Sequence, residues 1–507
     1  MREKRIKSAL ISVFYKDGLE EIVSFLHKSG VKIYSTGGTY SFISDLGIPV
    51  TQVEELTTYP SILGGRVKTL HPSVFGGILA RRSNEEDAGQ LKKYNIPEID
   101  LVIVDLYPFE ETVAKSSEEQ ELIEKIDIGG ISLIRAAAKN YNDVLIISER
   151  KQYKALFDLL AGKKCFTDIE DRRYFATRAF QVSSNYDTAI FKYFNTDTGI
   201  TAFRESIDTA SHLRYGENPH QKGVFYGDID ALFEKLHGKE ISYNNLLDIE
   251  SAINLIDDFD ETTCVVIKHN NACGLASRST MKESWIKALE CDPLSAYGGV
   301  IIANETIGAD TATEIDKIFF EIVIAPGFSE EALTILKKKK NRIILLRKQA
   351  GQRTSQFRAL LNGVLWQESD RSTEKEEDMN PVTLRKPGKK EYEDLVFANK
   401  VVKHSKSNAI VLAKDKQLCA SGIGQTSRVD ALKQAIDKAR TFNFDLSGAV
   451  LASDAFFPFA DSVEIAHKAG ITSVVQPGGS VRDQDTIDFC NANDIAMVFT
   501  GIRHFKH

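Results

Sequence analysis

The sequence predicts an α/β protein with two domains, and three observations support that fold class. In residues 1–150, short apolar runs alternate with segments of helical periodicity, a pattern typical of a Rossmann-like sheet. One of these runs, Ile99–Leu106, has an uninterrupted apolar centre at Leu101–Val104, as expected for a parallel strand covered on both faces. At 507 residues, the chain is also longer than one typical domain. We therefore expect an N-terminal α/β domain followed by a larger region.

The first elements of the N-terminal domain follow in order along the chain. Residues 8–14 predict a strand, and Asp17, with Glu20 three residues later, predicts the start of a helix. Gly30 is placed to end this helix, because glycine commonly follows a helix C-terminus. Between these limits, apolar residues recur at helical spacing: Leu19, Ile22, Val23 and Leu26.

A second strand, Val31–Thr36, leads through the diglycine Gly37-Gly38 into a helix that we expect to begin at Thr39. The N-terminus of a helix favours a phosphate, because its backbone N–H groups are free and its dipole is positive there. Glycine turns between a strand and a helix are common, however. This stretch alone therefore fits an ordinary turn as well as a phosphate site.

Residues 195–211 are polar and weakly patterned, so we place the domain boundary there and expect domains at 1–195 and 196–507. The second is long enough for two subdomains. The charged stretch Glu368–Lys386 predicts a surface connection between them, and Lys337–Lys340 predicts a solvated helix end. We find no short-period internal repeat.

The composition is that of an ordinary soluble protein, with 42% hydrophobic and 27% charged residues. A net charge of −7 argues against a nucleic-acid partner, and the N-terminal apolar run is too short for a signal sequence or a membrane span. Six cysteines occur without a C-x-x-C pair, which predicts reduced, mostly buried thiols and neither a zinc ribbon nor a disulfide scaffold. We expect a cytoplasmic protein.

Several ionisable residues are predicted to meet at one edge of the N-terminal sheet. The loop Gly64–Pro72 contains two cations and a hydroxyl in four positions, and Ser12 and Lys16 follow the first strand at the edge where such folds bind ligands. Tyr107 follows a buried strand, and Asp127 precedes the helix that carries Lys139. For any one of these residues alone, a surface salt bridge or a helix cap is the better interpretation.

Together, GGRVKTLHP, STGGT upstream, and DIGG and AAAK downstream resemble the IMP cyclohydrolase domain of the bifunctional enzymes of purine synthesis. The resemblance implies the fold of methylglyoxal synthase. The substrate contacts that it implies are Ser12, Lys16, Thr36, Gly38, Thr39, Arg66, Lys68 and Thr69. The catalytic residues that it implies are Lys68, Tyr107, Asp127 and Lys139. Cations and a phenol suit the ring closure, because they stabilise an oxyanion while Asp127 handles a proton.

In the second region, the apolar run Cys264–Ile267 predicts a buried strand that ends in Lys268 and His269, a typical position for catalytic groups. The motifs LRYGENPHQ, IKHNNACG, VKHSKSNAIV, SDAFFPF and GIRHFKH resemble, in this order, the transformylase domain of the same family. The resemblance covers essentially the whole chain. It implies a cytidine-deaminase-like domain of two subdomains.

For this second site the resemblance implies catalysis by Lys268 and His269, with Arg214 and Tyr215 holding the nucleotide. Four other residues line the site by the same resemblance: Asn408, Phe456, Phe457 and His507. The expected reaction transfers a formyl group from the co-substrate 10-formyltetrahydrofolate to aminoimidazole carboxamide ribonucleotide (AICAR). The product, FAICAR, is then cyclised to inosine monophosphate (IMP). Which of the two catalytic residues is the acid and which the base stays open.

The expected partners are AICAR, FAICAR, IMP and folate, and by resemblance a second copy of the chain, with the transformylase site built across the subunit boundary. No catalytic metal is expected, because the H-x-E and P-C-x-x-C zinc signature is missing from the sequence. The chain departs from the family pattern at Thr36, Asp105, Ala272 and Asn399, where serine, asparagine, proline and tryptophan are usual. Methylglyoxal synthase activity and a nucleotide-sensing module are the two alternatives.

Overall fold

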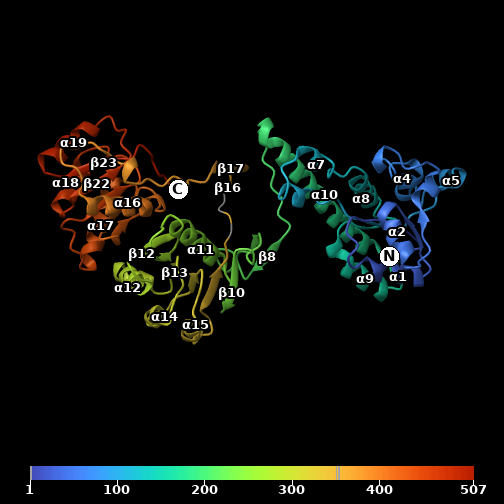
Figure 1. Ribbon diagram of the computed structural model, residues 1–507, viewed down its shortest axis with the longest axis horizontal. Helices are drawn as coiled ribbons and strands as arrows, with labels where there is room; N and C mark the ends of the chain where they lie inside the picture. The colour runs from blue at the N-terminus through green and yellow to red at the C-terminus, as the bar shows by residue number, and fades with distance from the viewer. Residues whose placement is uncertain (1–2, 350, 352–353) are drawn as a thin grey trace. The chain divides into compact units, whose positions relative to one another are not determined.

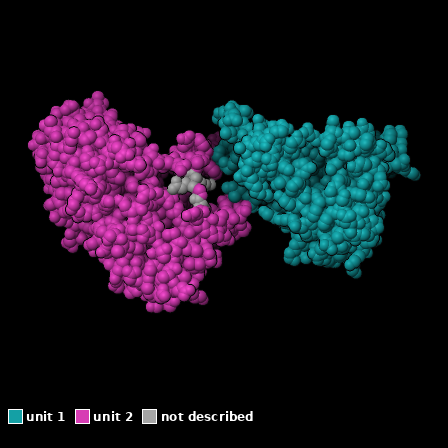
Figure 2. Space-filling view, viewed as in Figure 1, with its two compact units in different colours: residues 1–208 teal, residues 209–507 magenta. Residues whose placement is uncertain are grey.

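The computed structural model describes residues 3–349, 351 and 354–507, and it divides into two compact units, Met1–Asp208 and Thr209–His507 (Figures 1 and 2). The boundary expected between residues 195 and 196 falls inside the long helix α10, Ile169–Thr198. The segment after this helix stays with the first unit, because Glu205 pairs with Lys192 and Asp208 accepts a hydrogen bond from Gln181. The two units therefore separate at residues 208 and 209.

The first unit is built on a parallel five-stranded sheet with the order β4-β3-β2-β5-β6. Its strands are β2 Ser8–Ser12, β3 Lys32–Ser35, β4 Thr51–Gln52, β5 Leu101–Val104 and β6 Leu145–Ile147. A short pair, β1 Lys4–Arg5 and β7 Phe166–Thr167, lies outside this sheet. The predicted α/β class is confirmed, and the parallel order brings the carboxyl ends of the strands to one edge.

Helices cover both faces of this sheet. They are α1 Leu19–Lys28, α2 Gly37–Asp45, α3 Val53–Thr57, α4 Pro72–Leu79, α5 Glu85–Lys93, α6 Phe109–Val113, α7 Glu119–Ile123, α8 Gly129–Lys139, α9 Tyr153–Gly162 and α10, with short 3-10 turns at Leu63–Gly65 and Arg150–Gln152. Alternate residues of β2 and β5 point into two separate cores, one shared with α1 and α9 and the other with α4 and α8. Strands buried on both faces explain the uninterrupted apolar runs in the sequence.

Two details of the expected elements differ in the structure. Helix α1 begins at Leu19 with the left-handed Gly18 as its N-cap, so Asp17 is not the cap and instead pairs with Arg150. Helix α2 begins at Gly37 rather than Thr39, because Thr36 is the extended residue that precedes the helix. The predicted end of α1 is confirmed, since Gly30 adopts a positive φ of 75°.

The second unit contains a twelve-stranded sheet with the order β10-β15-β14-β13-β11-β12-β20-β19-β21-β22-β23-β18. Its strands are β10 Phe233–His237, β11 Thr263–Lys268, β12 Asn271–Ser277, β13 Val300–Ala303, β14 Ile322–Ala325, β15 Ile343–Arg347, β18 Asn380–Pro381, β19 Ile410–Lys414, β20 Gln417–Gly422, β21 Val450–Ser453, β22 Ser473–Gln476 and β23 Ala496–Phe499. Two hairpins lie outside it: β8 Ala210–Leu213 with β9 Gly223–Tyr226, and β16 Ser355–Leu360 with β17 Gly363–Glu368.

The helices of the second unit alternate with these strands. They are α11 Tyr243–Ile256, α12 Met281–Cys291, α13 Pro293–Ala296, α14 Ala309–Ile315, α15 Glu330–Leu336, α16 Lys389–Lys403, α17 Arg428–Thr441, α18 Asp461–Lys468 and α19 Asp483–Ala492, with a 3-10 turn at Glu376–Asp378. Three hydrophobic clusters cover the two faces of the sheet. The expected pair of subdomains thus shares one continuous sheet.

The two halves of this sheet have the same topology. In the first, β11 pairs antiparallel with β12 and β13, and β14 and β15 continue in parallel from β13. In the second, β19 pairs antiparallel with β20 and β21, and β22 and β23 continue in parallel. Helices α11 and α16 precede the two hairpins. The structure therefore contains a repeat of topology that is not visible in the sequence.

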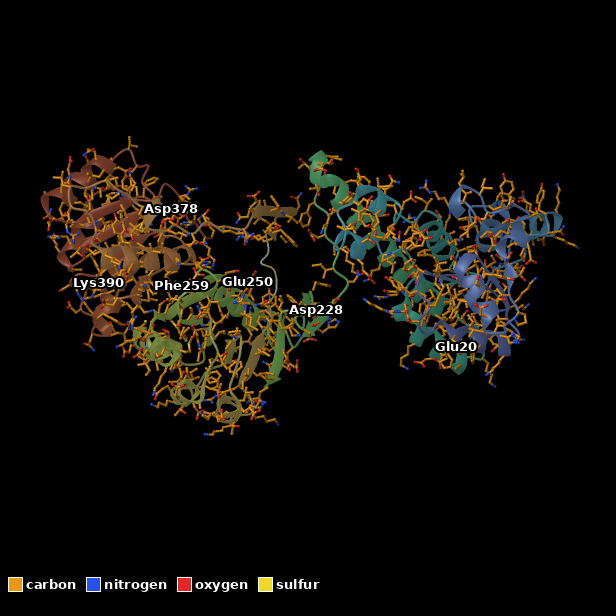
Figure 3. All side chains as sticks on the ribbon, in the orientation of Figure 1. Glu20, Asp228, Glu250, Phe259, Asp378 and Lys390 are labelled. Atoms are coloured by element: carbon orange, nitrogen blue, oxygen red, sulfur yellow. The ribbon has the colours of Figure 1, made fainter. Side chains whose placement is uncertain are left out.

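The halves join in the middle of the sheet, where Ala276 of β12 pairs with Gln417 of β20. Away from the sheet, the ring of Phe259, labelled in Figure 3, packs edge-on against Phe397 with their centroids 5.5 Å apart. Both rings belong to one core cluster that contains residues of both halves. The second unit is accordingly one body with a shared core.

The stretch Glu368–Lys386 is not the simple surface connection that its charge predicted. It contains β18, which pairs with β23 at the edge of the sheet, and the buried side chain of Glu374. The stretch is therefore part of the structure: the buried carboxylate of Glu374 accepts hydrogen bonds from Asn399 and His504. The basic run Lys337–Lys340 is exposed directly after α15, as the sequence predicted.

Among the described residues, no helix combines the length and apolar character that crossing a membrane requires. All six cysteines are free and buried. This confirms the prediction of buried thiols, and burial raises the pKa of Cys264, Cys273, Cys291, Cys419 and Cys490 to about 12.

We predict that residues 1–208, made alone, fold as a unit and unfold cooperatively. A fragment ending at residue 195 should be less stable by about 1 kcal/mol, because it loses the last turn of α10 and the contacts of Glu205 and Asp208. Urea unfolding followed by circular dichroism measures both. Equal stability of the two fragments would contradict the placement of the boundary after Asp208.

Candidate active sites

The first candidate site lies at the N-terminus of α2, where β3 ends. Thr36 is buried, and its Oγ1 has no hydrogen-bond partner in the part of the chain that the structure describes. Burying an unpaired hydroxyl is costly, so such an atom indicates a position for a ligand group. Backbone N–H groups of the first turn of α2, which includes Gly38, are also free of helical partners. The combination suits an anion.

Two lysines add positive charge to this position. A β-carbon at Gly37 would lie only 2.8 Å from Nζ of Lys68, so the glycine allows this ammonium to reach the start of α2. Lys16 donates from Nζ to the carbonyl oxygens of Val13 and, at 3.0 Å, Phe14. Burial lowers the pKa of Lys16, the charge of Asp105 raises it, and the charge of Lys68 lowers it. The two predicted cations are therefore neighbours.

Asp127 lies on the other side of Lys68, just before α8. Its carboxylate accepts a hydrogen bond from the N–H of Gly130 at 2.6 Å. Burial raises the pKa of Asp127, whereas N–H groups of Gly130, Tyr107 and Ile131 and the charge of Lys68 oppose that rise. A carboxyl group with a raised pKa beside an ammonium is suited to proton transfer.

Tyr107 and Thr69 border the same carboxylate. Tyr107 is 42% exposed, and burial together with the charge of Asp127 raises its pKa, so its phenol stays protonated and can donate a hydrogen bond. A β-carbon at Gly129 would lie 2.9 Å from Oγ1 of Thr69, which places the 66–69 loop against the start of α8. The structure thus brings Lys68, Thr69, Tyr107 and Asp127 together.

Thr39 and Asp105 fix the loop after β2. Thr39 is buried, and its hydroxyl bonds to both the N–H and the carbonyl of Val13, so it supports the loop that leads from Ser12 to Lys16. Asp105 accepts the N–H groups of Phe14 and, at 3.1 Å, Tyr15 on its two oxygens. An asparagine has one acceptor oxygen in place of two, which gives the departure at position 105 a physical consequence.

Two expected members of this site lie apart from the cluster. Lys139 is the last residue of α8, about 15 Å along the helix from its first turn, and is exposed. Asp127 and Lys139 are only twelve residues apart in the sequence, but α8 places them at opposite ends of a helix. Arg66 is exposed and pairs with Glu124.

The sequence did not single out Lys125 and Tyr186, which also contact the site. Nζ of Lys125 lies 5.7 Å and 5.9 Å from the ring centroids of Phe14 and Tyr107. The Tyr186 hydroxyl donates to the carbonyl of Lys125 at 2.7 Å and accepts the N–H of Asp127 at 2.8 Å. Tyr186 belongs to α10, so no local pattern could connect it with a loop sixty residues upstream.

The second candidate site is the turn between β11 and β12. Lys268 ends β11 and donates from Nζ to the carbonyl of Tyr297 at 2.9 Å, whereas His269 is exposed at the tip of the turn. Both central residues of the turn, His269 and Asn270, have positive φ, 50° and 64°. The carboxylate of Asp248 in α11 accepts the N–H of Asn270 at 2.7 Å. The turn therefore carries a lysine and a histidine at consecutive positions.

Arg214 and Tyr215 follow β8. Nη2 of Arg214 donates to the Tyr215 hydroxyl at 2.9 Å, and the guanidinium lies 4.7 Å from the centroid of that ring. The loop behind them contacts α11, since Asn244 donates to the carbonyl of Glu217 at 3.2 Å. Helix α11 therefore supports both this loop and, through Asp248, the Lys268 turn.

Asn408 precedes β19 and belongs to a network of buried charge. Its Oδ1 accepts from Arg428 at 2.9 Å, and its Nδ2 donates to the carbonyl of Gln425 at 3.0 Å. Arg428 in turn pairs with the buried Asp454. The Ser407–Asn408 peptide bond is cis. The network holds the Asn408 amide in one orientation.

The two phenylalanines of SDAFFPF have different environments. Phe456 is 38% exposed and is available to a ligand. Phe457 is fully buried in the core of the second half, and its N–H donates to Gln476. The structure therefore does not present Phe457 to a ligand, because neighbouring residues alternate between surface and core at this point of the chain.

His507 is exposed at the chain end, where its ring contacts Phe505 at 5.7 Å between centroids. The segment is anchored by His504, which bonds to Asp370 at 2.6 Å and to Glu374 at 3.0 Å. Burial opposes a charge on His504, but the two carboxylates raise its pKa to about 9. Asn399, in place of the usual tryptophan, donates to Glu374 at 2.6 Å. This buried cluster was not foreseen from the sequence.

In one chain, Lys268 ends β11 and Asn408 precedes β19, and these two strands are not neighbours. β12 and β20 lie between β11 and β19, so the two strand axes are about 14 Å apart. Across the described ranges, no three His, Cys, Asp or Glu side chains form a group with the spacing of metal ligands.

Comparison with known proteins places these sites in context. The family described as AICARFT/IMPCHase bienzyme matches residues 137–438, and the MGS-like domain matches residues 18–132. The chain is 63% identical over 504 residues to the Bifunctional purine biosynthesis protein PurH of Bacteroides thetaiotaomicron, covering 99% of each protein.

More distant bacteria have relatives of the same name. The protein of Acetivibrio thermocellus is 49% identical over 519 residues, which cover 99% of this chain and all of the relative. That of Aquifex aeolicus is 47% identical over 509 residues, with 98% of this chain and all of the relative covered. The similarity therefore extends through both compact units.

We predict that Asp127 makes the stability of the first unit fall as pH rises. The folded-state pKa of this carboxyl is raised, so the favourable contribution of its protonated form is complete below the unfolded value of 3.8 and is lost as pH rises through the folded value. The unfolding free energy of the wild type, relative to Asp127→Asn, should therefore decrease as pH rises above about 4. Urea unfolding of residues 1–208 measures this. A pH-independent difference would contradict the buried environment.

Proposed function

Because the chain belongs to the AICARFT/IMPCHase bienzyme family, we propose that its two activities reside in two separate pockets, one in each compact unit. The chain is a bifunctional enzyme of purine biosynthesis, an AICAR formyltransferase and an IMP cyclohydrolase. Similarity over the full length to bifunctional relatives favours this function over methylglyoxal synthesis or nucleotide sensing. The single observation that carries this assignment is that the two clusters lie in different units: Lys68, Tyr107 and Asp127 in the first, and Lys268 and His269 in the second.

The proposed cyclohydrolase pocket is the edge of the first sheet. The FAICAR phosphate would occupy the N-terminus of α2, where the Thr36 hydroxyl and Lys68 suit a dianion. Attack of the carboxamide nitrogen on the formyl carbon creates an oxyanion, and water then leaves. Lys68 and the protonated Tyr107 can stabilise that oxyanion, and the Asp127 carboxylate can take the nitrogen proton. The substrate contacts of Ser12, Lys16 and Gly38 belong to this proposal.

The proposed formyl-transfer site is the turn that carries Lys268 and His269. The AICAR amine is a weak nucleophile, because its lone pair is conjugated with the ring. Its attack on the formyl carbon of 10-formyltetrahydrofolate therefore needs a base for the amine proton and a cation for the oxyanion. An imidazole beside an ammonium supplies both. Phe456 is exposed enough to contact the folate, and Arg214 with Tyr215 would hold the nucleotide.

We propose that two copies of the chain complete this site. Two strands separate β11, which ends at Lys268, from β19, which follows Asn408, and this separation supports a site that uses one group from each of two chains. The hairpin β16–β17 also exposes Leu361, Val364, Leu365 and Trp366. An isolated hairpin with an apolar surface is typical of a contact with a partner.

We propose that the domains follow the two units, with cyclohydrolase in residues 1–208 and transformylase in residues 209–507, so that the division expected at residues 195 and 196 moves to 208 and 209. A cytoplasmic location is proposed as well. Free, buried cysteines support it, since such thiols are typical of proteins in a reducing compartment.

We predict that Lys268→Ala or His269→Ala lowers formyl transfer by about 100-fold or more, whereas FAICAR cyclisation by the same protein is unchanged. The matched control is Lys414→Ala. Lys414 ends β19 as Lys268 ends β11, and it donates to the carbonyl of Ser447 at 2.7 Å. This control should keep its formyl transfer. Spectrophotometric assays of both half-reactions test the proposal, and parallel loss of both activities in folded protein would refute it.

A further expectation concerns the first unit alone. Residues 1–208 should convert FAICAR to IMP at a rate close to that of the full chain and should not formylate AICAR, because the proposed cyclohydrolase groups all precede Asp208. A folded fragment without cyclisation would show that the pocket needs groups from the second unit.

A further inference from the structure

The turn that carries Lys268 and His269 is a two-residue hairpin loop between paired strand ends, left-handed at both central positions. Both of its central residues have positive φ, which costs a residue with a β-carbon about 1 kcal/mol. Asparagine and histidine are among the residues that adopt this conformation more readily than most. A neighbouring group that accepts the N–H donors of such a turn fixes its placement further.

That support comes from Asp248 on α11. Its Oδ1 accepts the N–H of Asn270 at 2.7 Å, and the N–H of His269 interacts with the same carboxylate. With its nitrogen facing these acceptors, the Asn270 side-chain amide lies 3.1 Å from both Oδ1 of Asp248 and the carbonyl of Leu247. The next residue of the helix, Ile249, is anchored in the core. The carboxylate is therefore a rigid point of attachment.

The second half of the sheet contains the same device. Asp394 and Asp248 are each the sixth residue of their helix, counted from Lys389 and Tyr243. Asp394 accepts the N–H groups of Asp415 and Lys416 at 2.9 Å and 2.6 Å. These two turn residues both have a φ of 51°. An aspartate that holds a left-handed turn is thus a repeated element of this fold.

The two turns differ in what holds their outer side. In the second half, Arg278 donates to the carbonyls of Asp415 and Lys416 at 2.6 Å and 3.2 Å, and so closes the turn. Within the described residues, no guanidinium contacts the corresponding carbonyls of His269 and Asn270. At the first turn the carbonyl of His269 accepts from Nδ2 of Asn271 at 2.8 Å, within the hairpin itself, and the support from a neighbouring helix is that of Asp248.

We propose that Asp248 is the positioning residue of the formyl-transfer site: its carboxylate fixes the His269–Asn270 turn and thereby the placement of Lys268 and His269. The inference rests on the proposed function of that pair. Asp248 does not touch the substrate in this scheme. A displacement of about 1 Å in a catalytic group can lower a rate by about 100-fold, so loss of this contact should reduce turnover more than binding.

The test compares Asp248→Ala and Asp248→Asn with Asp394→Ala in the full-length protein. We measure kcat and KM for AICAR and 10-formyltetrahydrofolate, FAICAR cyclisation, and thermal unfolding. Asp248→Ala should lower the formyl-transfer kcat by about 10- to 100-fold, with both KM values changed much less and cyclisation unchanged. Asp248→Asn should recover part of the rate, because its amide oxygen still accepts one N–H.

Asp394→Ala is the matched control, since it removes the same contact from the sealed turn. It should lower the unfolding temperature to a similar degree while keeping kcat near that of the wild type. A wild-type kcat in Asp248→Ala overturns the inference, and so does an equal loss of kcat in Asp394→Ala. Lys268→Ala is measured alongside: undiminished transfer in that variant refutes the proposed function itself, whatever the result at Asp248.

Discussion

Buried or half-buried aspartates that accept backbone N–H groups fix the loops of both candidate sites and one turn outside them. Asp105 fixes the loop after β2, Asp127 the start of α8, and Asp248 and Asp394 the two left-handed turns. For all four carboxyls, burial raises the pKa and backbone N–H groups oppose that rise. Burying a carboxylate costs several kcal/mol, and these hydrogen bonds offset the cost. Loops that bear the reactive groups are thereby made as rigid as the sheets beside them.

The same physical solution supports two different chemistries. In the first unit, the parallel strands end together, and a helix N-terminus beside two lysines creates an electropositive edge for a phosphate. In the second unit, an antiparallel hairpin projects a lysine and a histidine from its tip. In the proposed scheme the first arrangement closes a ring within one molecule, and the second joins two molecules. In that scheme only the second site has to orient a formyl donor and an acceptor separately.

Much of the first unit could be predicted from the sequence, because buried parallel strands and an amphipathic helix leave clear periodicities. Asp17 was wrong as a helix cap because the left-handed Gly18 intervenes. Other features depend on tertiary packing alone. The sequence carried no local signal for Asp248, because the turn that it contacts lies about twenty residues further along the chain. The repeat was missed because the two halves share their topology but not their side chains. Phe457 resembled its neighbour Phe456 in type but not in burial.

The turn at Asp415, whose carbonyls Arg278 binds, bears on the origin of the two halves. If the two halves descend from one duplicated ancestor, each inherited a hairpin, a supporting aspartate and a lysine at the strand end. The turn of the second half would then have gained the hydrogen bonds from Arg278 and kept a structural role, while the turn at His269 stayed without them. Under that descent, the supporting aspartate serves a structural turn in one half and the proposed formyl-transfer turn in the other.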